Sequence, residues 1–356
     1  MEKTPNNKYT VGITQGDING IGYEVIFKAL SDSATYDDCT FVIYGSPKIA
    51  AFHRKQVNLG NMVVNNANTI EDIVPNAINI INVCDENTRV DLGISTIQAG
   101  ECALAAIHRA TADLKNNQLD ILVNAPVNTA NLMDAGFKFA GVPEYVAHEL
   151  NCRNFVLMMV GSKIRIASAT SPMPIAGVLG ALSTEKIYWK IKTLNKTLKD
   201  DFAIRKPRIA VLGLNPFASD CGVFGQEESD RILPAIDKAS SEDVVVFGPY
   251  SPDSFFASEA YLKFDAVLAM TYDQAVVPFR IIEGDGGVGY TGGLPIVCTA
   301  PMHGPAYDIA GKGVADDTSM RNAIYRAVDI MYSKKILDGI VPLRRQTEHE
   351  ADKKIC

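Results

Sequence analysis

The segment TVGITQGDINGIGYEVIFKAL, residues 10–30, sets the fold class of this chain. An apolar run at Thr10–Thr14 predicts a buried strand, and Tyr23–Leu30 repeats apolar residues at helical spacing. The glycine-rich stretch Gly16–Gly22 joins the two elements. Such a loop either presents backbone N–H groups to an anion at the helix N-terminus or serves as a tight turn, and glycine suits both uses. A strand, a loop and a helix in this order indicate an α/β fold.

The same alternation of short apolar strands and longer amphipathic helices continues along the chain. It predicts a largely parallel sheet covered by helices, with ligand-binding loops at the strand ends. At 356 residues the chain is long enough for two cores. We expect one lobe from residues 1–125 with a C-terminal part at about 300–356, and a second lobe at about 126–299. The expected strands are Thr10–Thr14, Thr40–Tyr44, Ala77–Asn82, Leu119–Val123, Phe155–Val160, Ile164–Ala169, Arg208–Leu212, Val244–Phe247 and Ala266–Met270, and the expected helices are Tyr23–Leu30, Ile97–Asn116, Val142–Asn151, Leu182–Asp201 and Asp317–Ser333, followed by a charged, frayed tail from Pro342.

The composition restricts the classes of partner. With 34 Lys+Arg and 41 Asp+Glu the net charge is −7, which opposes attraction to nucleic acid or to anionic lipid. No apolar run approaches the ~18 residues of a membrane span, and the polar start MEKTPNNKYT is unlike a signal peptide. We therefore expect a cytoplasmic protein that binds neither nucleic acid nor membrane. Its seven cysteines include no C-x-x-C pair, which predicts buried, reduced thiols.

Two further glycine-containing segments are candidates for ligand binding. Gly284–Gly289 matches the letters G-x-G-x-x-G, but no helical pattern follows it, so we interpret it as a flexible loop rather than a dinucleotide fingerprint. The segment His303–Gly313 (HGPAYDIAGKG) combines an imidazole, a carboxylate and exposed backbone in a compact turn. Such a turn suits an adenine and its ribose, although an isolated histidine is more often a satisfied structural residue.

Six segments, in one order along the whole chain, resemble the 4-hydroxythreonine-4-phosphate dehydrogenase family. The last of them also resembles the adenosine-binding loop of isopropylmalate and isocitrate dehydrogenases, the structural relatives of that family. The six are GITQGDINGIGYE at Gly12–Glu24, NAPVN at Asn124–Asn128, GLNPFASDCGVFGQEE at Gly213–Glu228, GPYSPDSFF at Gly248–Phe256, MTYDQ at Met270–Gln274, and His303–Gly313.

The resemblance implies two α/β/α lobes with a cleft between them and a homodimer in which both subunits complete each site. It implies NAD-dependent oxidation of a phosphorylated hydroxy-amino acid in vitamin B6 (pyridoxal phosphate) biosynthesis, with a divalent metal such as zinc or magnesium that polarises the substrate hydroxyl. The matching positions imply catalytic roles for Asp253 and Asp273, with a structural role at a strand end as the alternative for both. Tyr272, which stands in place of a family histidine, is a further candidate catalytic residue. The matching positions also imply NAD binding by Asn215, Gly222, Gly225, Glu228, His303, Gly304, Ala306 and Asp308.

The chain departs from the family pattern at the three metal-binding histidines. Their positions hold Pro172 (or Ser171 with a shifted gap), Phe217 and Tyr272. Proline and phenylalanine supply no ligand, and a neutral phenol is a poor one. We therefore predict no metal ligands, apart from one alternative: a magnesium site of carboxylates, using Glu144, Asp253 and Asp273. The remaining histidines, His53, His108, His148 and His349, fall outside every motif and are expected to be structural or surface residues.

The positions that bind substrate phosphate in the family have also changed. Val142 and Pro143 replace a His-Thr pair ahead of Glu144, while Gly289 and Cys298 stand where the family has asparagine and arginine. Glu144 and Arg280 remain as candidate substrate-binding residues, and Arg280 is the one cation of two that is kept. A single guanidinium is a weak site for a phosphate monoester, which usually receives several charge-assisted bonds.

Three functions stay open at this point. The chain is a dehydrogenase of this family with impaired or altered activity, a catalytically degenerate paralogue that acts as a binding or regulatory protein or partner subunit, or a metal-independent enzyme on a different substrate. The last requires the pKa of the Tyr272 phenol to fall, with Arg280 as the candidate cause. An enzyme should keep a cleft near Tyr272, Asp273 and Arg280. A scaffold protein should fill that space with Val142, Met173 and Phe217.

Overall fold

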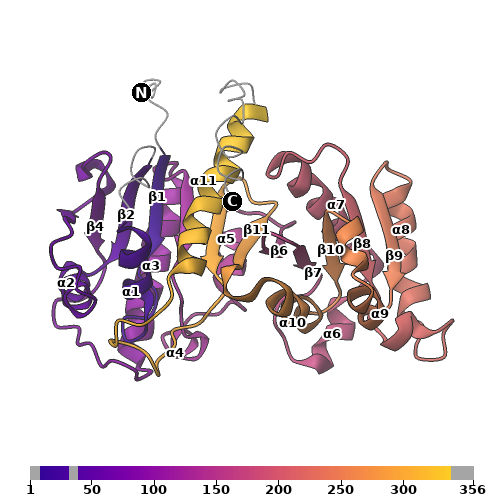
Figure 1. Ribbon diagram of the computed structural model, residues 1–356, viewed down its shortest axis with the longest axis horizontal. Coiled ribbons are helices and arrows are strands. Elements are labelled where there is room, and N and C mark those ends of the chain that lie inside the picture. Colours follow the sequence, from indigo (N-terminus) through magenta and orange to yellow (C-terminus); the bar gives the residue numbers. More distant parts are fainter. Residues whose placement is uncertain (1–8, 32–38, 338–356) are drawn as a thin grey trace, which may run out of the picture.

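The computed structural model describes residues 9–31 and 39–337. Within these residues 12 strands form one sheet that runs the length of the molecule, in the order β3-β4-β2-β1-β5-β12-β11-β6-β7-β10-β8-β9 (Figure 1). The strands are β1 Tyr9–Thr14, β2 Cys39–Gly45, β3 Asn65–Ala67, β4 Ile78–Asn82, β5 Ile121–Asn124, β6 Val156–Val160, β7 Arg165–Ser168, β8 Arg208–Leu212, β9 Val245–Tyr250, β10 Ala266–Ala269, β11 Val288–Gly292 and β12 Val297–Pro301.

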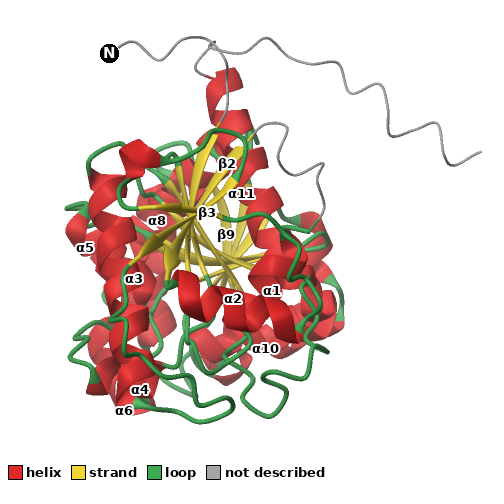
Figure 2. Cartoon of the chain, turned by 90° about the vertical axis from the view of Figure 1, so that its left-hand side faces the viewer, coloured by secondary structure: helices red, strands yellow, loops and turns green. Residues whose placement is uncertain are grey.

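Helices cover both faces of this twisted sheet, as Figure 2 shows along the sheet. The α/β prediction with a largely parallel sheet is therefore confirmed. No helix of the described residues is long and apolar enough to cross a membrane. The helices are α1 Gly22–Ala29, α2 Pro47–Gln56, α3 Ile97–Lys115, α4 Thr129–Asp134, α5 Val142–Glu149, α6 Ile175–Ala181, α7 Thr184–Asp200, α8 Leu233–Ser240, α9 Pro252–Ala257, α10 Tyr272–Glu283 and α11 Thr318–Leu337, with short helical turns at Ile70–Asp72, Pro216–Ser219, Glu228–Ile232, Ala260–Lys263 and Gly284–Gly286.

Local signals in the sequence explain several helix boundaries. The Ser183 side chain accepts a hydrogen bond from the Lys186 amide and caps α7, whose apolar face is buried. At the start of α10 the Thr271 hydroxyl accepts from the Gln274 amide, and the Gln274 side chain accepts from the Thr271 amide. The predicted last helix is present and longer, because α11 continues to Leu337. The predicted tail from Pro342, with His349 and Cys356, lies outside the described residues.

The expectation of a flexible loop at Gly284–Gly289 is wrong. Gly284–Gly286 forms a helical turn, and β11 begins at Val288. This strand is antiparallel to β12 on one side and to β6 on the other. The glycine-rich sequence does not predict a strand here, because the strand depends on hydrogen bonds from its two neighbours. Strand β12 and the short strand β3 were not predicted either.

The division into lobes remains a prediction, but two contacts support it. Strand β12, late in the sequence, pairs in parallel with β5, and α11 packs against β12, β5 and α1. The C-terminal part thus returns to the half of the sheet built by residues before 125, as Figure 1 also shows by colour.

The thiols and histidines are mostly as expected. Cys39, Cys84, Cys102 and Cys298 are buried thiols, whereas Cys221 is exposed, against the prediction of burial. The ring of His53 is buried, and its Nε2 lies 2.9 Å from the Ile18 carbonyl.

The glycine-rich loop at Gly16–Gly22 is a tight turn. The Asn19 amide donates to the Asp17 carboxylate (2.8 Å), and the Gly20 amide donates to the Asp17 carbonyl (3.2 Å). The Ile21 amide donates to the Pro305 carbonyl (2.9 Å). Because these N–H groups are bound by the chain itself, the structure favours the turn over an anion site here.

Gly20 lies directly against the later loop, which generates a test of this packing. A β-carbon at Gly20 would lie 2.6 Å from the Pro305 carbonyl oxygen and 2.7 Å from its Cβ. We expect Gly20→Ala to lower the free energy of unfolding by roughly 1–3 kcal/mol, because backbone must move to make room. Gly180→Ala is the matched control, since nothing lies within 4 Å of its added carbon. Equal denaturant midpoints for the two variants would contradict the prediction.

Candidate functional site

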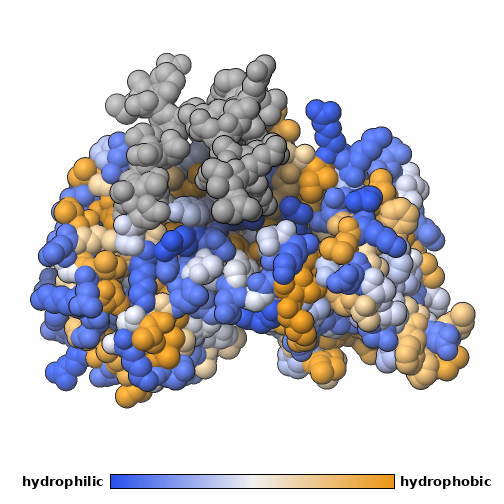
Figure 3. Space-filling model, in the orientation of Figure 1, coloured by the Kyte–Doolittle hydropathy of each residue, from blue (hydrophilic) through white to orange (hydrophobic). Residues whose placement is uncertain are grey.

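A pocket of about 410 Å³ lies where the two halves of the sheet meet. Strands β12, β11 and β6 form one wall, and the chain after β5 and β12 forms the rim together with α5 and α10. In Figure 3 the lower edge of the molecule is indented between the two halves. Ligands of α/β sheets bind at the carboxyl ends of strands where the strand order changes, and the pocket has this position. Its lining comprises Asn124–Val127, Val142, Pro143, Leu157–Met159, Tyr272, Arg280, Gly289–Thr291 and Cys298–Gly304.

Three polar side chains from separate segments converge on this pocket. Tyr272 is the first residue of α10, and Arg280 lies two turns further along the same helix. His303 comes from the loop after β12. Burial raises the pKa of the Tyr272 phenol above its usual value, although the Arg280 guanidinium opposes this rise. The phenol is therefore a hydrogen-bond donor at neutral pH.

His303 has one ring nitrogen occupied and one available. Its Nδ1 lies 3.1 Å from the Gly304 carbonyl oxygen. Because a carbonyl only accepts, this bond places the proton on Nδ1 and leaves Nε2 as an acceptor in the neutral ring. Nε2 is buried and has no hydrogen-bond partner among the described residues. An acceptor of this kind is suited to a ligand hydroxyl or amino group.

A second hollow of about 180 Å³ adjoins the first. Arg280, Met302 and His303 line both, so these residues stand between the two spaces. The Arg280 guanidinium donates to the Met302 carbonyl, which fixes the arginine over the boundary. The second hollow also exposes the carboxylates of Asp285 and Asp316.

The loop from His303 to Gly313 is held to the first half of the molecule by buried polar groups. The Tyr307 hydroxyl donates to Asp17 Oδ2 (2.7 Å), and the Asn131 amide donates to the same oxygen (2.7 Å). Asn128 donates to the Tyr307 hydroxyl (2.9 Å). Asp17 is almost fully buried, so these bonds are shielded from water and the loop has one fixed position.

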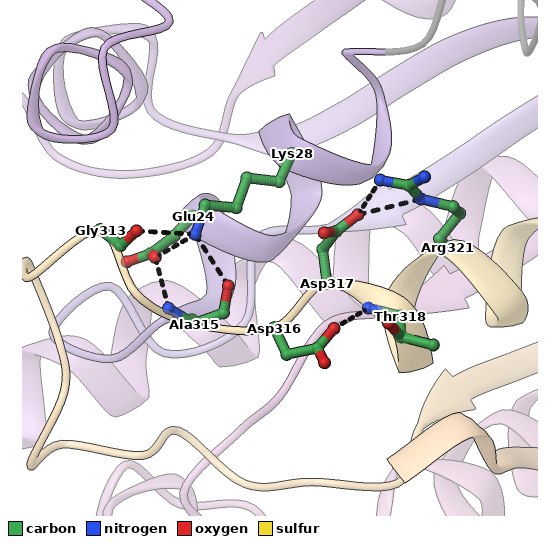
Figure 4. Close-up of polar contacts among 8 residues, drawn as sticks. All are labelled: Glu24, Lys28, Gly313, Ala315, Asp316, Asp317, Thr318 and Arg321. Atoms are coloured by element: carbon green, nitrogen blue, oxygen red, sulfur yellow. Dashed lines mark hydrogen bonds and ion pairs between the residues drawn. The ribbon is translucent and has the colours of Figure 1, made fainter.

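The far end of this loop is anchored on α1 (Figure 4). Glu24 Oε1 accepts from Lys28 Nζ (2.8 Å) and from the Ala315 amide (2.8 Å). Lys28 Nζ also donates to the carbonyls of Gly313 (2.9 Å) and Ala315 (2.8 Å). Beside this network Asp316 caps the start of α11 by accepting from the Thr318 amide, and Asp317 pairs with Arg321.

A second predicted cofactor loop is also assembled around a buried carboxylate. Glu228 Oε1 accepts from the amides of Leu214 and Asn215, both at 2.8 Å, and Glu228 Oε2 accepts from Asn215 Nδ2 (2.9 Å). Gly222 and Gly225 have φ of +93° and +126°, where a side chain would be strained. The structure therefore brings Asn215, Gly222, Gly225 and Glu228 into one loop, and His303, Gly304, Ala306 and Asp308 into another.

Comparison with known proteins agrees with this architecture. The family model described as "Pyridoxal phosphate biosynthetic protein PdxA" matches residues 37–327. The chain belongs to the PdxA family. It is 40% identical to the 4-hydroxythreonine-4-phosphate dehydrogenase of Bacteroides thetaiotaomicron, over 97% of this chain and 96% of that protein. The crystal structure of 4-hydroxythreonine-4-phosphate dehydrogenase from Klebsiella pneumoniae superposes with a TM-score of 0.77 at 29% identity, over 91% of this chain and 100% of that one.

A more distant structure confirms the predicted fold class. Isocitrate dehydrogenase from Methylococcus capsulatus superposes with a TM-score of 0.50 at 11% identity, over 93% of this chain and 89% of that chain. At this identity the similarity concerns the fold alone.

The positions that the family resemblance assigns to metal ligands hold side chains with other surroundings in this chain. Ser171 donates to Glu144, Pro172 is exposed, and Phe217 is 60% exposed beside Phe224 (ring centroids 5.6 Å apart). Across residues 9–31 and 39–337, no group of three or more His, Cys, Asp or Glu side chains is placed to hold a metal ion.

The alternative magnesium site of Glu144, Asp253 and Asp273 is therefore wrong. Asp253 instead accepts from Ser251, an interaction that lowers the pKa of its carboxyl group. Neither Asp253 nor Asp273 lines the pocket, and both are exposed. Glu144 also lies outside the pocket lining, although its neighbours Val142 and Pro143 belong to it. The structure thus gathers Tyr272, Arg280, His303 and Gly304 and leaves the three carboxylates apart.

The space near Tyr272 is open rather than filled. Val142 lines the pocket as expected, but Met173 and Phe217 do not, and 38% and 60% of their surface is exposed. The sequence placed Gly289 and Cys298 in the site, but it did not predict that β11 and β12 form its wall, nor the buried Asp17–Tyr307 bond. The one signal for the latter was the Gly-Asp pair at Gly16–Asp17, in a motif already quoted.

The raised pKa of Tyr272 can be measured directly. We expect the difference in phenolate absorbance between the wild-type protein and Tyr272→Phe to be absent below about pH 10, the usual tyrosine value, because burial disfavours the charged form. A phenolate signal titrating near neutral pH would contradict this and would restore Tyr272 as a low-pKa acid or base.

The Glu24–Lys28 anchor generates a stability prediction. We expect Lys28→Met to lower the free energy of unfolding by roughly 3 kcal/mol, because Glu24 would be left as an uncompensated buried charge. Lys196→Met is the control, since Lys196 pairs with Asp200 on the surface, where ion pairs contribute little. Chemical denaturation of both variants decides the matter: a Lys28→Met protein as stable as the control would remove the anchoring role.

Proposed function

We propose that this protein is a pyridine-nucleotide-dependent dehydrogenase that oxidises a hydroxyl group of a small anionic substrate, in the manner of its PdxA-family relatives in pyridoxal phosphate biosynthesis. The observation that carries the proposal is the convergence of Tyr272, Arg280 and His303 on one open pocket beside the loop His303–Gly313. A chain that had kept only the fold would have no reason to keep this space free of side chains.

The fit of a nucleotide is supported by the groups that face the second hollow. His303 and Ala306 line this hollow, and the buried Nε2 of His303 lacks a partner among the described residues. Gly304 lines the adjoining larger pocket, and the position of its β-carbon is surrounded by open space. We assign the adenosine side of NAD to His303, Gly304, Ala306 and Asp308. Asn215, Gly222, Gly225 and Glu228 shape the second loop toward the same cofactor.

On the substrate side we assign two roles. Arg280 pairs with the negative charge of the substrate, and the neutral phenol of Tyr272 donates a hydrogen bond to the reacting oxygen. NAD⁺, if bound beside this pocket, would supply the hydride acceptor for the carbinol carbon, and the hydroxyl proton would pass to water. For Asp253 and Asp273 the family resemblance is the only support for a catalytic role, because neither residue lines the pocket.

The divalent metal of the family does not fit the residues present. The first expected ligand position holds Pro172, which has no donor atom for a metal, or Ser171, whose hydroxyl already donates to Glu144. The second holds Phe217, which has no donor atom either, and the third holds Tyr272. We therefore derive no step through a metal. A Lewis acid contributes several kcal/mol in such reactions, so turnover of the family's phosphorylated hydroxy-amino acid should be slower by orders of magnitude.

A second candidate function is a binding or partner subunit without catalysis, and the replacement of all three histidines favours it. The third possibility, a low-pKa Tyr272 as acid or base, is opposed by the direction of its pKa shift.

We also propose a homodimer. Ile175 on α6 and Ile281 on α10 are 86% and 80% exposed, and burying such side chains between subunits is favourable.

Metal removal separates the proposed dehydrogenase from a metal-dependent one. We expect NAD⁺ to bind in calorimetric titration, and NADH formation from 4-hydroxythreonine 4-phosphate to be slow and unchanged by EDTA. We expect His303→Ala to weaken NAD⁺ binding at least tenfold, since Nε2 is the free acceptor of the site. Lys196→Met, a change on the surface of α7 at a residue that lines neither hollow, is the control.

Two outcomes would overturn this assignment. Loss of activity on chelation would mean that a metal site forms from residues not identified above. Absence of NAD⁺ binding would leave the binding-protein function as the better account.

A further inference from the structure

We infer that the pocket accepts a substrate with a single negative charge, a monocarboxylate with a largely hydrocarbon body, in preference to a phosphate ester. This inference rests on the proposed function, because it names the substrate class of that same site. It follows from the charge, the donors and the walls of the pocket.

The pocket holds one formal positive charge. Among the described residues of one subunit, Arg280 is the only Lys or Arg in the lining, and no Asp or Glu belongs to it. Part of the guanidinium is already used, since it donates to the Met302 carbonyl. A planar guanidinium pairs well with one carboxylate, whereas a phosphate monoester carries nearly two charges and three acceptor oxygens.

The neutral donors of the pocket are mostly committed to the protein. Thr299 donates its hydroxyl to the Ala323 carbonyl (3.0 Å) and Asn124 donates to the Cys298 sulfur (3.4 Å). The Tyr290 hydroxyl donates to Asp201 on the far side of the strand (2.7 Å). The Thr291 hydroxyl hydrogen-bonds the Cys298 thiol. Among the hydroxyl groups of the lining this leaves that of Tyr272, which makes no hydrogen bond to any described residue. One donor for the reacting oxygen and one cation for the charge suit a hydroxy monocarboxylate.

The walls are hydrocarbon and sulfur. Val142, Leu157, Met159 and Met302 contribute them, and Val142 and Met159 are almost fully buried. Cys298 lies in the same wall, and burial raises the pKa of its thiol to about 12, so it stays neutral. Such a surface gains from an apolar ligand, and it penalises a second charge that no group compensates.

The test compares two ligands on one protein. Dissociation constants for 2-hydroxy-4-methylpentanoate and for 4-hydroxythreonine 4-phosphate are measured by calorimetry, each with and without NADH. We expect the monocarboxylate to bind at least tenfold more tightly. Arg280→Met should weaken its binding at least tenfold, and Arg153→Met, a change of an exposed arginine outside the pocket, should alter it less than twofold.

A change of charge inside the pocket provides the reverse test. Cys298→Arg adds a second cation to the wall and should shift the preference at least tenfold toward the phosphate ester. Pro143→Lys, on the partly exposed rim, makes the same test if the buried Cys298 site does not tolerate arginine. Circular dichroism and NADH binding verify that each variant is folded.

The outcomes separate this inference from the proposed function. Equal or tighter binding of the phosphate ester by the wild-type protein overturns the inference, as does an Arg280→Met protein with unchanged carboxylate affinity. If NADH binds and neither ligand does, the inference fails while the nucleotide-binding function stands. If NADH and both ligands fail to bind, the proposed function itself is wrong.

Discussion

The arrangement of this molecule depends on the hydrogen-bond ladder of one strand, β11. It runs antiparallel between β12, which belongs with β5 and the first half of the sheet, and β6, which leads into the second half. Without β11 the sheet would have two open edges in the middle of the molecule. The same three strands form a wall of the pocket, so the ladder that joins the halves also fixes the distance across the site.

The loops beside the pocket depend on buried polar groups rather than on their own conformational preferences. Asp17 binds Tyr307, Glu24 binds the Ala315 amide, and Glu228 binds two amides of the other loop. Each carboxylate is almost fully buried. In such surroundings a bonded carboxylate stabilises one loop position, because any other position would leave a desolvated charge without partners. Glycine at position 20 then allows the two loops to touch.

How far the sequence predicts this structure depends on the range of the interactions involved. The strand Thr10–Thr14, the helix Tyr23–Leu30 and the capped helix α7 carry their signals locally, and they appear within one or two residues of the predicted bounds. Strand β11 does not, because Gly284–Gly293 is rich in glycine and becomes a strand only when two distant partners supply its ladder. For the site, motif matching brought forward Tyr272, Arg280 and His303, which all line the pocket, and their catalytic and binding roles stay predictions. It also grouped Glu144, Asp253 and Asp273, whose separation depends on tertiary packing.

The positions that match the PdxA family and those that depart from it differ in what they touch. Asp17, Glu24 and Glu228 match, and each carboxylate accepts hydrogen bonds from several buried groups, so replacing one would leave these groups without a partner. Pro172 and Phe217 depart, and both are exposed to solvent. A residue whose contacts are with a ligand can change without unfolding the protein, whereas a residue that binds buried backbone cannot. In this chain the fold therefore restricts substitution strongly at the residues that hold the loops and weakly at the exposed positions where the family binds its metal. This is the condition under which one scaffold acquires a different substrate.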